Sequence, residues 1–157
     1  MIRRAEKRDI EDIDRLLFQV NNVHADGRPD LFKHGCKKYT DEELFEIIAD
    51  EKRPVFVYTD EKDEHVFGYA FCMIEEYEND HNMVDRKTLY IDDLCVDEEV
   101  RGRHIGSKLY EYVYGYAEGI GCHNLTLNVW SLNADAMKFY ETLGLKPYKT
   151  GMEVILN

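Results

Sequence analysis

The most informative segment of this sequence reads Val100-Arg101-Gly102-Arg103-His104-Ile105-Gly106-Ser107. It follows a strand-like apolar run, residues 89–96, and it opens a helix-like run, residues 107–113. A glycine-bearing turn between a strand and a helix is typical of an anion site, because the start of a helix presents unpaired N–H groups and a partial positive charge. Arg101 and Arg103 add fixed charge and forked donors that suit phosphate oxygens. The segment therefore predicts a site for a ligand that carries a diphosphate.

This segment resembles the cofactor turn of the GNAT acetyltransferases, whose motif reads Gln/Arg-x-x-Gly-x-Gly/Ala. Arg101 and Gly106 match the two ends of the motif, and His104 stands in place of its first glycine. The histidine keeps the backbone N–H groups that a diphosphate needs, although its Cβ leaves the turn less free. The resemblance implies acetyl-CoA as co-substrate, held by the turn and by the strand before it. These residues are Leu94, Cys95, Val96, Arg101, Gly102, Arg103, His104, Ile105, Gly106 and Ser107.

A second match lies downstream, in residues 128–145. There the family has an Asn that contacts the pantetheine arm, followed by a helix that carries a Phe-Tyr pair and ends at Leu-Gly. The resemblance adds Asn133, Ala136 and Tyr140 to the cofactor residues. The two matches stand in the family's order and together span about residues 65–157. The sequence thus predicts a single GNAT domain over residues 1–157, with a mixed α/β sheet and helices on both faces.

Composition narrows the class of protein further. The chain has 157 residues, is 44% hydrophobic and carries a formal net charge of -12. This charge argues against a nucleic-acid partner and favours a cationic one. No apolar run reaches membrane-spanning length and the first residues lack a signal-peptide core, so we expect a cytoplasmic protein with no membrane partner. The four cysteines and six histidines show no ligand spacing, so we expect no metal.

Periodicity predicts the remaining elements. Apolar residues at helical spacing follow Asp9, a candidate N-cap, and a second helix follows the capping-box pattern at Thr40. Gly119 and Gly121 end the helix that follows the cofactor turn, at about Glu118. The predicted strands cover residues 54–58, 66–74, 89–96, 125–130, 147–148 and 152–156, and a last helix covers residues 134–143. Antiparallel strands first and β-α-β units later make a mixed sheet.

Acetyl transfer to an amine requires a base, because a lysine-like ammonium costs roughly 4–5 kcal/mol to deprotonate at pH 7. Asp92 and Asp93 are the candidates, and adjacent strand residues normally face opposite ways, so we expect only one in the cleft. Resemblance to the polyamine and diamine acetyltransferases implies that Asp92 is the base, through water, and that Asp93 attracts the cationic acceptor. Pairing with an arginine or capping a loop is the alternative for either residue.

The same resemblance implies that Tyr140 is the general acid that protonates the departing thiolate. It also implies that Leu94, Cys95 and Val96 act through their backbone, with one N–H polarising the acetyl carbonyl. An ordinary aromatic on an apolar helix face is the alternative for Tyr140.

The acceptor pocket is predicted to include Asn128 and Trp130, and Trp130 is also a candidate for a dimer interface. The segment His24-Ala-Asp-Gly-Arg28-Pro29-Asp30 lies in the same region and has no assigned chemistry. We expect N-acetylation of a small cationic amine such as a polyamine, in a possible homodimer. Two alternatives stay open: a protein N-terminal or lysine acetyltransferase, and a CoA-binding module without transfer activity.

Overall fold

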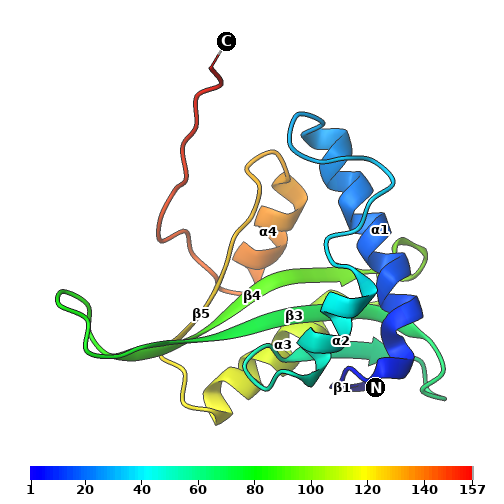
Figure 1. The fold of residues 1–157 in the computed structure, drawn as a ribbon, viewed down its shortest axis with the longest axis horizontal. Coiled ribbons are helices and arrows are strands. Elements are labelled where there is room, and N and C mark those ends of the chain that lie inside the picture. The colour runs from blue at the N-terminus through cyan, green and yellow to red at the C-terminus, as the bar shows by residue number, and fades with distance from the viewer. Residues whose placement is uncertain (157) are drawn as a thin grey trace.

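The computed structural model describes residues 1–156, which form one five-stranded sheet with helices on both faces (Figure 1). The strands are β1 (Ile2–Arg4), β2 (Val55–Thr59), β3 (Val66–Tyr77), β4 (Arg86–Val96) and β5 (Asn124–Leu127). The helices are α1 (Ile10–Gly27), α2 (Asp41–Ala49), α3 (Ile105–Gly119) and α4 (Ala134–Thr142), with short 3-10 turns η1 (Lys7–Asp9) and η2 (Glu98–Val100). This architecture confirms the mixed α/β fold predicted from the sequence.

The strands lie side by side in chain order, from β1 to β5. The first four pair antiparallel, and β5 pairs parallel to β4 because α3 carries the chain back across the sheet. The parallel pairing runs from Thr88↔Asn124 to Ile91↔Leu127 and then ends, although β4 continues to Val96. Within residues 1–156, the last five residues of β4 therefore have no strand beside them on the β5 side.

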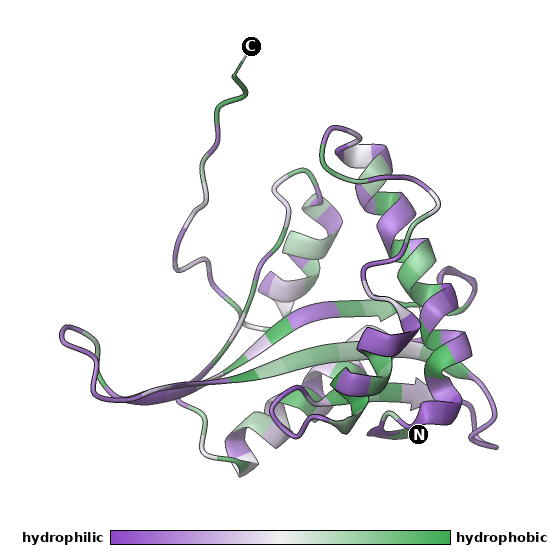
Figure 2. Cartoon of the chain, viewed as in Figure 1, coloured by the Kyte–Doolittle hydropathy of each residue, from purple (hydrophilic) through white to green (hydrophobic). Residues whose placement is uncertain are grey.

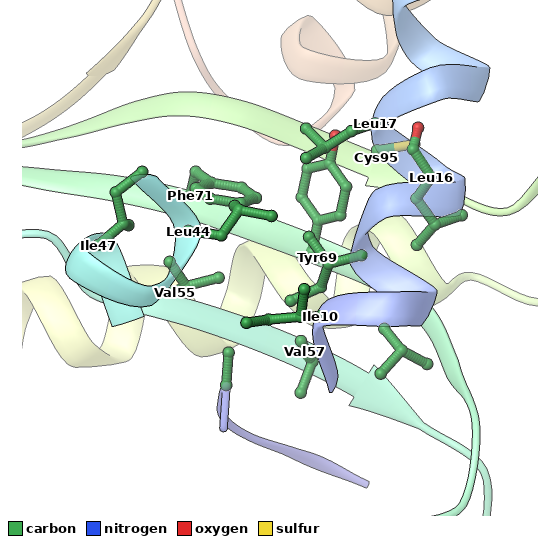
Figure 3. Packing of buried hydrophobic residues seen from close by; sticks show 13 residues of the cluster. Ile10, Leu16, Leu17, Leu44, Ile47, Val55, Val57, Tyr69, Phe71 and Cys95 are labelled. Atoms are coloured by element: carbon green, nitrogen blue, oxygen red, sulfur yellow. The ribbon is translucent and has the colours of Figure 1, made fainter. Parts of the chain in front are cut away.

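Alternation along the strands builds two hydrophobic layers. Val55 and Val57 face α1 and α2, whereas Phe56 between them faces α3. Figure 3 shows the first layer, in which Tyr69 and Phe71 of β3 pack under the apolar side of α1 and α2. The colouring of Figure 2 shows the same division, with apolar residues on the inner side of the helices and polar residues outside. None of the helices in residues 1–156 is both long and apolar enough to cross a membrane.

The predicted helix starts are only partly correct. Thr40 caps α2, because its hydroxyl accepts a hydrogen bond from the Glu43 N–H at 3.2 Å. Asp9 precedes α1 as predicted, but its carboxylate does not cap that helix. It accepts hydrogen bonds from the Glu6 N–H and from the Arg3 guanidinium instead, and so joins β1 to η1.

The predicted final strands are wrong. Residues 145–156 contain no strand and extend away from the body of the protein, and β5 ends at Leu127 rather than at Trp130 (Figure 1). The physical reason is that a strand needs a neighbour for its N–H and C=O groups. Within residues 1–156, β4 is the only strand that pairs with β5, and none pairs with residues 145–156.

Candidate active site

A β-bulge in β4 brings two carboxylates to the same face of the sheet. Phe71 pairs with Asp93 while its neighbour Cys72 pairs with Ile91, so Asp92 is an extra residue on β4. A bulge of this kind bends a strand and re-aims its side chains. The expectation that only one of the two aspartates faces the cleft is therefore wrong, because both now reach groups on the side that α1 and α2 cover.

Asp92 is held by the segment that precedes α2. Its Oδ2 accepts a hydrogen bond from the Tyr39 hydroxyl at 2.5 Å and forms an ion pair with Lys38 Nζ at 2.8 Å. The Tyr39 ring stacks on Phe71, 5.5 Å between centroids, which fixes its hydroxyl over the bulge. Burial and then the hydrogen bond to Asp92 raise the pKa of Tyr39, so this hydroxyl stays protonated and keeps donating.

Asp93 lies deeper. Its Oδ2 accepts a hydrogen bond from the Tyr69 hydroxyl at 2.7 Å, and Tyr69 itself is fully buried. Burial raises the pKa of Asp93 to about 6, even though the Tyr69 hydrogen bond and the charge of Lys38 act in the opposite direction. A carboxylate with such a pKa is ionised at neutral pH and can accept a proton readily.

Tyr140 of α4 lies close enough to Asp93 for the charge of that carboxylate to affect its pKa. Burial and then the negative charge of Asp93 raise its pKa well above the usual value for tyrosine. Its ring meets Phe139 edge-on, with 5.1 Å between the centroids. Tyr140 therefore keeps its proton at neutral pH and is available as a donor.

The end of β4 offers backbone groups on its open side. The Asp97 N–H donates to the Phe67 carbonyl at 2.8 Å, so by alternation Cys95 bonds toward β3 while Leu94 and Val96 point their N–H and C=O groups away from it. The Gln19 amide reaches the Val96 carbonyl at 3.4 Å from that open side.

The Cys95 side chain points into the hydrophobic core under α1. Its thiol is buried under α1, 3.9 Å from the Leu16 carbonyl, and burial raises its pKa to about 12. The structure thus places Cys95 in the core and away from the open edge of β4, where Leu94 and Val96 lie.

The predicted anion turn is strained where the motif has glycine. His104 adopts a left-handed conformation, φ 58° and ψ 25°, immediately before α3. No side chain caps α3, so the first N–H groups of the helix, at Ile105, Gly106 and Ser107, have no side-chain cap. Arg101 and Arg103 are exposed on the same turn. The turn fits a diphosphate because its donors are uncapped and its flanking side chains are cationic.

Gly106 connects this turn to α4. A Cβ at this position would lie 3.2 Å from Cζ of Phe139 and 3.7 Å from Cγ2 of Val96. The glycine therefore allows the start of α3 to approach the helix that carries Tyr140 and the open end of β4.

The residues after β5 serve different purposes. Asn133 caps α4, because its Oδ1 accepts a hydrogen bond from the Ala136 N–H at 3.1 Å, so these two predicted cofactor residues partner one another. The Asn128 amide donates to the Tyr90 hydroxyl at 3.2 Å. Trp130 meets Phe32 edge-on at 5.6 Å, and the Arg28 guanidinium lies over its ring at 5.9 Å.

Two other polar groupings lie away from the aspartates. A cleft of about 450 Å³ runs between α1 and η2, lined by Arg15, Gln19, Asn22, Val23, Asp26, Asp97, Glu98 and Glu99. Asp60, Glu64 and His65 meet within 4.8 Å on the turn between β2 and β3. There the Asp60 carboxylate accepts the Glu64 N–H at 2.8 Å, as turn formation alone requires.

Comparison with known proteins agrees with this geometry. The acetyltransferase (GNAT) family matches residues 15–145, which include the bulge, the turn and α4. The chain belongs to the GNAT family. The family uses acetyl-CoA, and the uncapped start of α3 and the open backbone of β4 in this GNAT chain suit that co-substrate.

Individual relatives of this GNAT protein differ in how much they share with it. A mutant of the BH1408 protein from Bacillus halodurans is 32% identical, with a TM-score of 0.94 over 100% of this chain and 99% of that one. Thialysine N-epsilon-acetyltransferase of Bos taurus is 40% identical over 58 residues, 37% of this chain and only 34% of that protein. An aminoglycoside N-acetyltransferase in complex with CoA shares the fold alone, at 18% identity and a TM-score of 0.70 over 100% and 99% of the two chains.

Proposed function

We propose that this GNAT protein transfers the acetyl group of acetyl-CoA directly to the primary amine of a small cationic acceptor. The observation that carries the proposal is the bulge at Asp92, which turns Asp92 and Asp93 to one face beside Tyr140. A carboxylate pair next to a protonated tyrosine supplies the base and the acid that the reaction needs.

The co-substrate is held in this proposal by two sets of backbone groups. The N–H groups of Ile105, Gly106 and Ser107 take the diphosphate, helped by Arg101 and Arg103. The open-side groups of Leu94 and Val96 take the pantetheine amides, in a manner that resembles strand pairing. Acetyl-CoA supplies an activated thioester carbonyl, and a free N–H of β4 polarises it.

The acceptor loses its proton to Asp93 in this proposal. The resemblance assigned that role to Asp92, but the contacts favour its neighbour. Asp92 already binds the Lys38 ammonium and the Tyr39 hydroxyl, whereas the charge of Asp93 raises the pKa of Tyr140. With a pKa of about 6, Asp93 is ionised at pH 7 and is a stronger base than an ordinary aspartate.

Asp92 then holds the acceptor as a cation. Its contact with Lys38 Nζ, at 2.8 Å, is a contact with a primary ammonium, the same chemical group that a diamine or lysine-like acceptor presents. Lys38 is partly exposed, with 44% of its side chain accessible, so an incoming ammonium can take its place. The net charge of -12 attracts such an acceptor from solution.

Tyr140 completes the reaction by donating its proton to the thiolate of CoA as the thioester bond breaks. The bond between the amine nitrogen and the acetyl carbon forms as the bond between that carbon and sulfur breaks. The first proton of the ammonium goes to Asp93, which returns it to solvent, and the proton that the nitrogen loses on becoming an amide restores the Tyr140 hydroxyl. The raised pKa of Tyr140 ensures that the hydroxyl is protonated before each turnover.

Turnover of acetyl-CoA against a panel of acceptors tests the proposal, with free thiol as the readout. The panel contains diamines, polyamines, thialysine, neutral amines, and peptides with a free N-terminus or a lysine. We expect the highest kcat/KM for small dicationic amines. Peptides as the best acceptors would favour the protein acetyltransferase instead, and tight acetyl-CoA binding without turnover of any acceptor would favour the CoA-binding module.

A further inference from the structure

One of the protein's own lysines, Lys38, lies in the proposed acceptor site. It belongs to the irregular segment between α1 and α2 (Figure 1), and its Nζ forms an ion pair with Asp92 Oδ2 at 2.8 Å. The ammonium also lies over the Tyr39 ring, 5.4 Å from the centroid, and the Tyr39 hydroxyl donates to the same carboxylate oxygen. A primary ammonium is the group on which the proposed reaction acts, so the site already contains an acceptor of the required chemistry.

The proposed base lies close to this ammonium. Asp92 and Asp93 are neighbours on β4, with Cα atoms about 3.8 Å apart, and the bulge turns both carboxylates to the face that Lys38 approaches. Burial raises the pKa of Asp93, and the charge of Lys38 opposes that rise, so the two groups interact electrostatically. The Lys38 side chain is flexible and 44% accessible, so rotation about its own bonds carries Nζ from one carboxylate toward the other.

We propose that Lys38 is a self-acetylation site, to which the protein transfers the acetyl group of acetyl-CoA when no free acceptor is bound. The inference rests on the proposed function, because it uses the same base and acid. The Lys38 ammonium gives its first proton to Asp93, which returns it to solvent, and the neutral nitrogen bonds to the acetyl carbon. The bond between that carbon and sulfur breaks as Tyr140 protonates the thiolate. The proton that the nitrogen loses on becoming an amide restores the Tyr140 hydroxyl, and the products are acetylated Lys38 and free CoA.

Two other lysines that form ion pairs show what distinguishes Lys38. Lys37, the preceding residue, is bound by one carboxylate of α1 and one of α2, and only 19% of its side chain is accessible. Lys52 pairs with Glu76 at 2.9 Å, and 63% of its side chain is accessible. Exposure alone therefore favours modification of Lys52, whereas contact with the carboxylates of the candidate site favours Lys38.

Attachment to the chain makes Lys38 a strong competitor of free acceptors. A group held beside a site by a short flexible link has an effective concentration in the range of about 1 mM. Enzymes commonly have KM values of about 1 μM to 1 mM, so a free acceptor excludes Lys38 only when it is near saturation. Acetylation converts the Lys38 ammonium into a neutral amide, which no longer forms the ion pair with Asp92. The modification therefore leaves that carboxylate open to the ammonium of the next acceptor.

The experiment uses the whole chain, incubated with isotopically labelled acetyl-CoA in the absence of acceptor. Peptide mass spectrometry follows the label at each lysine with time. We expect Lys38 to be labelled at least about 10²-fold faster than Lys52, which is the internal control for chemical acetylation. Tyr140→Phe should slow the labelling of Lys38 by about 10²-fold and leave Lys52 unchanged. Lys38→Arg keeps a cation beside Asp92 but has no nucleophilic amine, so it should take up label only at the background rate of the other lysines.

The outcomes that would overturn self-acetylation are distinct. Equal labelling of Lys38 and Lys52, or labelling of Lys38 that Tyr140→Phe leaves unchanged, would mean that the thioester reacts without catalysis. A trace of parent protein mixed with the Tyr140→Phe variant tests transfer between copies, because the two chains differ in mass. Labelling of Lys38 in the variant chain would show that the reaction is not intramolecular.

The acceptor panel separates this inference from the proposed function. If small amines are acetylated while Lys38 stays unlabelled, self-acetylation is wrong and the proposed function stands. If acetyl-CoA binds but neither small amines nor Lys38 are acetylated, both are wrong. If both are acetylated, the best acceptor at saturation should suppress the labelling of Lys38 and not that of Lys52, and a failure to do so would place Lys38 outside the acceptor site.

Discussion

Replacing Asp93 with Asn keeps the shape of the side chain and removes its ability to take a proton. In the parent enzyme we expect kcat/KM to rise with pH to about 6, where Asp93 ionises, and then to level off. The variant can use only the acceptor molecules that are already neutral, and for a lysine-like amine these are about 0.04% at pH 7. Its rate should therefore rise about tenfold per pH unit over the range in which the parent is flat.

The size of the defect follows from the same reasoning. A general base contributes about 10²–10⁴-fold, so we expect a loss of about 10³-fold at pH 7. This loss in kcat/KM becomes about ten times smaller with each pH unit, so that at pH 9 the variant is only about tenfold slower than the parent. The measurement is kcat/KM from thiol release at several pH values, with the acceptor that turns over best. A curve for Asp93→Asn that runs parallel to the parent curve would refute Asp93 as the base.

Asp92→Asn is the matched control, because it removes the neighbouring carboxylate from the same bulge. We expect it to raise KM for dicationic acceptors while the shape of the pH curve is kept, since it loses attraction and not proton transfer. If Asp92→Asn, and not Asp93→Asn, shows the steep pH dependence, then Asp92 is the base as the sequence resemblance implied.

Stability provides a second check on Asp93. Its pKa rises on folding from 3.8 to about 6, so the folded state binds the proton more tightly than the unfolded state does. The folded state is therefore favoured at low pH and loses stability as pH rises through about 6, by at most about 3 kcal/mol. Because Asn has no charge to desolvate, Asp93→Asn should be more stable than the parent above pH 6 in urea unfolding and equal or less stable at pH 4. A variant that is inactive because it is unfolded would instead be less stable than the parent above pH 6.

Three further predictions concern the acid, the turn and the contact between α3 and α4. Tyr140→Phe should lower kcat by about 10²-fold with unchanged acetyl-CoA affinity in calorimetry, and a parent-like kcat would assign the acid elsewhere. His104→Gly should raise the free energy of unfolding by about 1 kcal/mol, because glycine adopts the left-handed conformation of this residue without strain, and an unchanged urea midpoint would contradict that account. Gly106→Val should weaken acetyl-CoA binding by pushing against Phe139, whereas Gly115→Val on the same helix, where a Cβ meets open space, should bind as the parent does.

Local sequence signals predicted much of the fold because local physics dominates there. The capping box at Thr40, the apolar spacing of α1 and the glycines after α3 indicate helix starts and ends through contacts only a few residues apart. The same holds for the strand-turn-helix unit around His104, whose uncapped N–H groups follow from its position before a helix.

The proposed reaction centre depends on contacts that no local pattern encodes. The bulge at Asp92 arises from the register between β3 and β4, and the partners of the two aspartates come from Tyr39 and Tyr69, far away in the chain. Tyr69 alternates with Phe71 in a predicted strand, which places it on the correct face, but nothing in the pattern joins it to Asp93. The raised pKa of Asp93 is a property of that burial, so sequence alone could not choose between the two carboxylates.

Residues 146–156 show the same limit in another form. Their alternating apolar residues predict a strand, and the prediction is wrong because a strand exists only where another edge accepts its hydrogen bonds. The sequence by itself predicted the four helices, the strand-turn-helix unit around His104 and the GNAT resemblance, since each of these depends on neighbours in the chain. Only the tertiary structure decided which carboxylate is buried, which backbone groups of β4 stay open and which edge of β5 lacks a partner, because those properties belong to residues brought together from distant parts of the chain.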